Sequence, residues 1–122
     1  MIVIPANAGI QRPTTDAAIG RVDQERELSM PAPIALQLYT LREAAAADYE
    51  GTVRKVADIG YAGVEPAGFP GTTVEAGKKL FDELGLQVCS AHLPLPIGDK
   101  VNESFETAAA LGIERVVAGI GR

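Results

Sequence analysis

Four polar side chains stand at or just beyond the ends of short apolar runs: Gln37, Tyr39, Glu65 and His92. His92 is the only histidine of the chain; its imidazole either binds a substrate hydroxyl or a metal ion, or hydrogen-bonds the backbone of its own loop. The carboxylate of Glu65 either accepts hydrogen bonds from substrate hydroxyls and acts as a base, or is a solvated loop acid. We predict these four residues as substrate-binding groups.

Other side chains leave two interpretations open. Gln37 interrupts the apolar run 34–39, so its amide must find partners and is either a pocket residue or a polar plug in an interior. Arg42 either meets a phosphate or is simply solvated. Phe69, in the loop 68–71, either covers a ligand or packs in the core. The single cysteine, Cys89, is expected to be a buried packing residue.

Three glycine-centred joints set the spacing of the chain after Met30. Each joint has an apolar residue, then glycine, then a new apolar run, and the glycines are Gly60, Gly85 and Gly112. Glycine suits a helix end because it adopts the left-handed conformation there without a steric penalty. The joints therefore predict three helix C-termini.

Helical spacing precedes each glycine, and a short apolar run follows it. The residues expected on the buried helix faces are Tyr49, Val53 and Val56; Gly77, Leu80, Phe81 and Leu84; Phe105, Ala108 and Ala109. The sequence Thr72 to Glu75 predicts a capping-box start for the second helix, and Asp99 or Asn102 a cap for the third. Strands are expected at 34–39, 61–65, 86–90 and 113–118, without amphipathic alternation, as in strands covered on both faces.

The order of these elements predicts an α/β fold with about four parallel strands and three helices. A doubly wound sheet would usually carry a glycine-rich phosphate turn after its first strand, whereas residues 40–43 read Thr-Leu-Arg-Glu. A (βα)₈ barrel needs no such turn, although a complete barrel has about 250 residues. We therefore predict residues 30–122 to be a partial (βα) TIM barrel, its N-terminal half.

Residues 1–29 show neither helical nor alternating periodicity and are expected to form a disordered, non-globular tail. The string 3–11 resembles translated interspersed-repeat DNA of bacterial genomes, which leads to the hypothesis of a start codon assigned too early, with Met30 as the true start.

Charge and composition indicate the kinds of partner. The net charge is −5 and the basic residues are scattered, so we expect no nucleic-acid partner. No apolar run approaches the ~20 residues of a membrane span, so we expect no membrane partner either. One cysteine allows no disulfide within the chain, and a cytoplasmic location is expected.

Four motifs in order resemble one family. Residues 36–42 (LQLYTLR), 59–65 (IGYAGVE), 90–94 (SAHLP) and 110–112 (ALG) are similar to the opening of sugar phosphate isomerase/epimerase proteins of the xylose isomerase-like TIM barrel superfamily. This resemblance implies metal-assisted proton transfer next to a sugar carbonyl, with Mn, Mg or Zn as the divalent metal of the intact family and a small sugar or sugar phosphate as ligand.

The resemblance also implies that most catalytic and metal-binding residues lie on later strands. We therefore expect no metal on this chain alone, no assigned catalytic residue, and a truncated, inactive protein. One alternative is a noncatalytic half-barrel that associates with itself or with another chain through its open sheet edges. Another is a zinc-dependent AP-endonuclease-like member of the superfamily, in whose relatives the residue matching His92 is a zinc ligand, and a last one is a doubly wound binding module.

Overall fold

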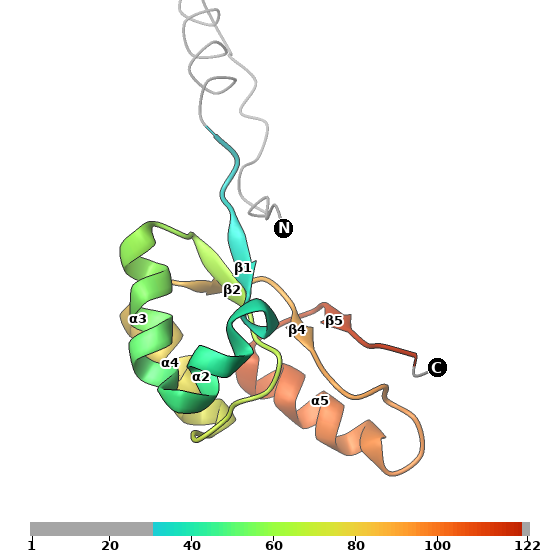
Figure 1. Ribbon diagram of the computed structural model, residues 1–122. Coiled ribbons are helices and arrows are strands. Elements are labelled where there is room, and N and C mark those ends of the chain that lie inside the picture. The colour runs from blue at the N-terminus through green and yellow to red at the C-terminus, as the bar shows by residue number, and fades with distance from the viewer. Residues whose placement is uncertain (1–30, 121–122) are drawn as a thin grey trace, which may run out of the picture.

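The computed structural model describes residues 31–120, which form an α/β arrangement of short strands and helices (Figure 1). The predicted tail 1–29 and the starting residue Met30 lie outside the described residues. The elements are β1 (Ala35–Gln37), η1 (Leu38–Leu41), α2 (Arg42–Ala47), α3 (Tyr49–Ile59), β2 (Gly63–Glu65), α4 (Val74–Glu83), β3 (Gln87–Val88), β4 (Ala91–His92), α5 (Lys100–Leu111) and β5 (Val116–Val117).

The strands pair in parallel, as predicted. β2 lies between β1 and β3, and β4 pairs with β5. Parallel neighbours joined by helices are the repeating unit of a (βα) barrel. The strands are shorter than the predicted runs, and after β1 the chain turns at once into the 3₁₀ helix η1, so Tyr39 lies in that helix and not in a strand.

The predicted strand 86–90 is interrupted by one extra residue. The backbone N–H of Cys89 donates to the carbonyl of Val64 at 3.1 Å, and that of His92 donates to the carbonyl of Pro66 at 2.9 Å. Three steps along this strand therefore match two steps along β2, which is a β-bulge. β3 and β4 together form the third strand of the barrel segment, and this bulge explains why five short strands stand where about four were predicted.

Helix ends follow the local sequence. The three joint glycines have positive φ values of 105° (Gly60), 69° (Gly85) and 66° (Gly112), as the left-handed helix end requires. Thr73 caps α4 by accepting a hydrogen bond from the backbone N–H of Ala76 at 3.1 Å, so α4 begins where predicted, with its cap one residue after the Thr72 of the predicted capping box. The third cap was predicted wrongly, because Asp99 makes no capping hydrogen bond with its side chain and Asn102 lies inside α5.

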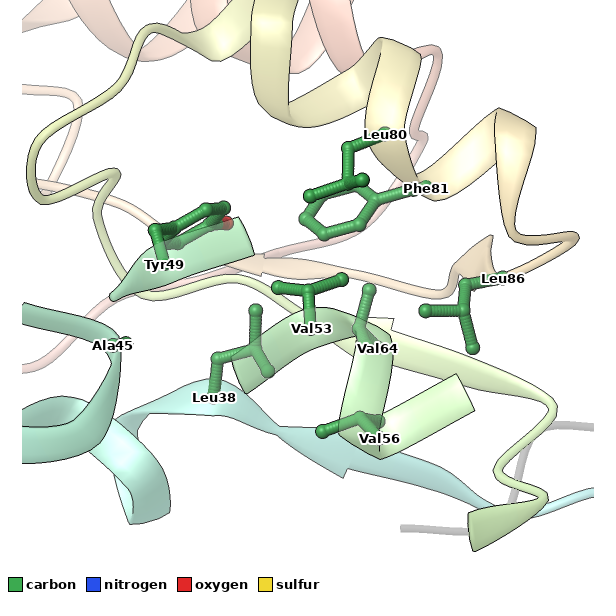
Figure 2. Packing of buried hydrophobic residues seen from close by; sticks show 9 residues of the cluster. All are labelled: Leu38, Ala45, Tyr49, Val53, Val56, Val64, Leu80, Phe81 and Leu86. Carbon is green, nitrogen blue, oxygen red and sulfur yellow. The ribbon is translucent and has the colours of Figure 1, made fainter. Parts of the chain in front are cut away.

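The main core lies between the strands and the helices α3 and α4 (Figure 2). Val53 and Val56 of α3 and Phe81 of α4 are buried against Val64 of β2, as their helical spacing predicted. Phe69 packs 6.0 Å from the ring of Tyr49 and 6.4 Å from the ring of Phe81, measured between ring centroids. Phe69 is thus a core residue and not a lid over a ligand.

The third helix turns differently from the prediction. In α5 the buried residues are Ser104 and Leu111, whereas Phe105 is 67% exposed and Ala109 is exposed. The hydroxyl of Ser104 donates to the carbonyl of Pro94 at 2.7 Å, and Leu111 packs with Ala91 and Leu93. These contacts direct Phe105 away from the core.

Tyr49 carries a buried hydroxyl that has no hydrogen-bond partner among the described residues. Burying such a group costs free energy, so we expect Tyr49→Phe to raise the free energy of unfolding by about 1 kcal/mol at neutral pH. Burial also raises the pKa of Tyr49 well above its ordinary value of 10.0. The folded state therefore keeps a proton that the unfolded state loses, and the wild type should lose stability as the pH rises above 10.

Urea unfolding of both proteins at pH 7 and at increasing alkaline pH tests this expectation. The stability gap between Tyr49→Phe and the wild type should widen with alkaline pH. A less stable Tyr49→Phe protein at pH 7 would mean that the hydroxyl has a partner after all.

Candidate functional site

The candidate site lies at the carboxyl ends of β1, β2 and the bulged third strand. Side chains alternate along a strand, so Gln37 and Glu65 share the face opposite Leu36 and Val64, and Val64 points to the helices. Gln37 and Glu65 are direct neighbours in the register of β1 and β2. In a closed barrel this face is the interior and this end is the mouth.

A chain of three hydrogen-bonded side chains crosses the strand ends. The amide Nε2 of Gln37 donates to Oε1 of Glu65 at 2.5 Å, and the hydroxyl of Ser90 donates to Oε2 of the same carboxylate. Glu65 is 2% exposed, so the solvated loop acid considered from the sequence is wrong. Gln37 is paired and half-buried, as the pocket and the plug interpretations both require.

Ser90 is the residue that the sequence prediction missed. It lies inside the β-bulge, and an extra residue at a bulge re-aims the neighbouring side chains. Its hydroxyl is buried with the carboxylate of Glu65. The available signal was its position at the end of the predicted strand 86–90, one strand away from Glu65.

Cys89 lies next to the hydrogen-bonded side chains of Gln37, Glu65 and Ser90. Its thiol contacts the carbonyl oxygen of Val64 at 3.4 Å and the hydroxyl oxygen of Ser90 at 3.5 Å. The side chain is half-buried, less than the fully buried packing residue that we expected.

The other two predicted residues, Tyr39 and His92, line one hollow of about 330 Å³ together with Leu93, Leu95 and Gly119 among others. The imidazole of His92 is exposed, and a Cβ at Gly119 would lie 3.7 Å from its Nε2 atom, so the absence of a side chain there leaves the ring accessible. The guanidinium of Arg42 stands over the ring of Tyr39 at 4.8 Å from its centroid, which is a cation–π contact.

The pair Gln37 and Glu65 lies next to the pair Tyr39 and His92. The backbone of His92 is bonded to Pro66, which follows Glu65 directly. The structure therefore brings the four predicted residues to one end of the strands, as a buried pair and an exposed pair. This arrangement offers an exposed imidazole and an aromatic ring, which are groups that bind a small polyhydroxylated molecule, beside a buried carboxylate that fixes the strand ends.

The described residues do not fit a metal centre. Within residues 31–120 no group of three or more His, Cys, Asp or Glu side chains could hold a metal ion. Both oxygens of the Glu65 carboxylate already accept hydrogen bonds from neutral donors. A single exposed imidazole lacks the companion ligands that a zinc site needs.

Comparison with known proteins gives a structural neighbour. No protein-family model matches the chain, and no curated protein does. The fold is similar to that of a sugar phosphate isomerase/epimerase from Parabacteroides distasonis ATCC 8503, with a TM-score of 0.57 and 25% sequence identity. The match covers 77% of this chain and 42% of that chain, so this chain spans less than half the length of its solved neighbour.

This neighbour confirms two predictions from the sequence. The resemblance to sugar phosphate isomerase/epimerase proteins is found again in three dimensions, and the fold class is that of a partial (βα) barrel. Among residues 31–120 the helices are too short or too polar to cross a membrane.

Proposed function

We propose that this chain is a sugar phosphate isomerase/epimerase-like partial barrel that binds a small sugar or sugar phosphate at Tyr39 and His92, with Gln37 and Glu65 positioning the strand ends beside them. The observation that carries the proposal is the hydrogen-bonded chain of Gln37, Glu65 and Ser90 across the ends of adjacent parallel strands. Ligand sites of (βα) barrels lie at this end of the strands. A cytoplasmic location belongs to the same proposal.

Each residue has a role that its geometry supports. Glu65 acts as a positioning residue, because its buried carboxylate holds Gln37 of β1 and Ser90 of the bulged strand together beside the hollow. His92 is exposed and can donate to or accept from a second hydroxyl. Tyr39 offers a ring face, and the Arg42 cation over it supports a phosphorylated ligand over a neutral one.

Turnover is not part of the proposal for this chain alone. The intact family uses a divalent metal, as the resemblance implies, and the described residues offer no set of ligands for one. We propose binding without isomerisation, and no step is routed through a metal. No observation favours the zinc-dependent nuclease, whose chemistry needs several metal ligands.

Isothermal titration calorimetry with ribulose 5-phosphate, fructose 6-phosphate and the corresponding neutral sugars tests the proposal. We expect binding of at least one ligand, and a loss of affinity of about 10-fold in His92→Gln, because one or two hydrogen bonds to the ligand are lost. Asp58→Asn is the control, since Asp58 is exposed in the last turn of α3, away from the strand ends that carry the site. Absence of binding by every ligand, or equal affinities of His92→Gln and the wild type, would refute the proposed site.

A further inference from the structure

The guanidinium of Arg42 is held beside the hollow that Tyr39 and His92 line. Its Cζ atom lies 4.8 Å from the centroid of the Tyr39 ring, and its Nη1 atom donates to the backbone carbonyl of Tyr39 at 3.3 Å. Tyr39 lies in η1 and Arg42 begins α2, so both contacts come from the stretch of backbone that follows β1 directly. An exposed arginine has many rotamers, and these two contacts restrict Arg42 to the border of the hollow.

The two contacts with Tyr39 use little of the hydrogen-bonding capacity of Arg42. The contact with the aromatic ring engages the positive charge of the guanidinium and takes none of its N–H groups. The carbonyl of Tyr39 accepts one N–H, and a guanidinium carries several in a planar fork. Arg42 can therefore keep its place over Tyr39 while two parallel N–H groups bind an anion in the bidentate geometry that suits phosphate.

The described lining of the hollow brings no carboxylate to this place. Apart from Tyr39 and His92, it consists of alanine, leucine, proline and glycine residues. The carboxylate of Glu65 is 2% exposed and accepts hydrogen bonds on both oxygens. Glu43 follows Arg42 in α2, and consecutive positions of a helix do not face each other. A ligand in the hollow therefore meets the positive charge of Arg42 at its border and no exposed negative charge in the described lining.

We propose that Arg42 is the specificity-determining residue of the candidate site and binds the phosphate group of a sugar phosphate whose hydroxyls meet His92. This inference rests on the proposed function and adds the residue that distinguishes a phosphorylated sugar from the corresponding neutral sugar. A phosphate monoester carries a charge of roughly −1.5 to −2 at neutral pH and oxygens that accept hydrogen bonds, and a bidentate contact with Arg42 uses both properties. A neutral sugar offers nothing that the guanidinium binds in this way.

Substitution of Arg42 separates the two kinds of ligand. Arg42→Gln removes the charge and the planar fork, so the affinity for the phosphorylated sugar should fall by about 30-fold, while the affinity for the neutral sugar stays within about 2-fold of that of the wild type. Arg42→Lys keeps the charge and loses the bidentate geometry, so the affinity for the phosphorylated sugar should fall by about 5-fold.

Titrations of the full chain followed by NMR test the inference, because they measure weak and tight binding on one scale. The ligands are ribulose 5-phosphate, fructose 6-phosphate and the two corresponding neutral sugars. Arg54→Gln is the matched control, since it makes the same chemical change at an exposed arginine of α3 whose guanidinium is paired with Glu50. The control should keep the affinities of the wild type for every ligand.

The outcomes distinguish this inference from the proposed function. Equal affinities of the wild type for the phosphorylated and the neutral member of each pair, or a preference for phosphate that survives in Arg42→Gln, would overturn the role of Arg42 and leave sugar binding standing. Absence of binding by every ligand would refute the proposed function and the inference together. Circular dichroism shows whether Arg42→Gln is folded, and if it is not, an unchanged affinity of Arg42→Lys for the phosphorylated sugar overturns the inference.

Discussion

Phe81→Ala is expected to lower the free energy of unfolding by about 4 kcal/mol. Phe81 is fully buried and lies in the middle of the main core, where Figure 2 shows its ring beside Leu80 and above Val64. Truncation removes apolar surface from the core and leaves a cavity that the surrounding helices fill only in part. Since a small domain has only ~5–15 kcal/mol of stability, this loss is a large share of the total.

Urea unfolding followed by circular dichroism at one protein concentration measures the effect. Phe105→Ala is the matched control, because it makes the same chemical change at an exposed position of α5. The control should change the free energy of unfolding by less than about 0.5 kcal/mol. Equal losses in both variants would contradict the assignment of the core, and with it the packing of α4 on the strands.

Glu65→Ala is expected to lower the free energy of unfolding by about 3 kcal/mol and to weaken sugar binding by loosening the strand ends beside the hollow. The variant removes the acceptor of two hydrogen bonds at a position that is 2% exposed. The amide of Gln37 and the hydroxyl of Ser90 are then left without this partner, and an unsatisfied buried donor costs more than the bond itself contributed. The weaker binding follows from the proposed function, and the loss of stability does not depend on it.

Glu65→Gln weakens the same chain of hydrogen bonds less. The glutamine has the same shape and its carbonyl oxygen can still accept one of the two hydrogen bonds, so the loss of stability should be about 1 kcal/mol. Sugar binding should weaken less than in Glu65→Ala, because one of the two hydrogen bonds that fix the strand ends is kept. Unfolding curves and calorimetry on the same samples measure both quantities. A stable Glu65→Ala protein, within about 0.5 kcal/mol of the wild type, would contradict the buried chain of hydrogen bonds.

The sequence predicted the local structure well at positions where a single physical rule decides the conformation or the burial of a residue. Gly60, Gly85 and Gly112 end helices or follow their last residue because only glycine adopts the left-handed conformation there without strain. Val53 and Val56 in α3, and Phe81 in α4, are buried because their spacing places each on the core-facing side of its helix. These rules act over a few residues, so the sequence alone expresses them.

The prediction failed where packing between distant segments decided the outcome. Phe105 and Ala109 were predicted on the buried face with Ala108, but the bond from Ser104 to Pro94 and the burial of Leu111 turn α5 so that only Ala108 of these three packs against the core. No local sequence pattern predicted the bulge around Ser90, because a bulge is an extra residue relative to the neighbouring strand.

By itself the sequence determined the parallel (βα) repeat with the helices α3, α4 and α5, but not η1 and α2, and the positions of Gln37, Glu65 and His92 near strand ends, because these follow from glycine conformation and apolar periodicity. Only the tertiary structure decided that Glu65 is buried between Gln37 and Ser90 and that Tyr39 and His92 line one hollow. Register, burial and hydrogen-bond partners depend on segments far apart in the chain, and they exist only once those segments lie side by side.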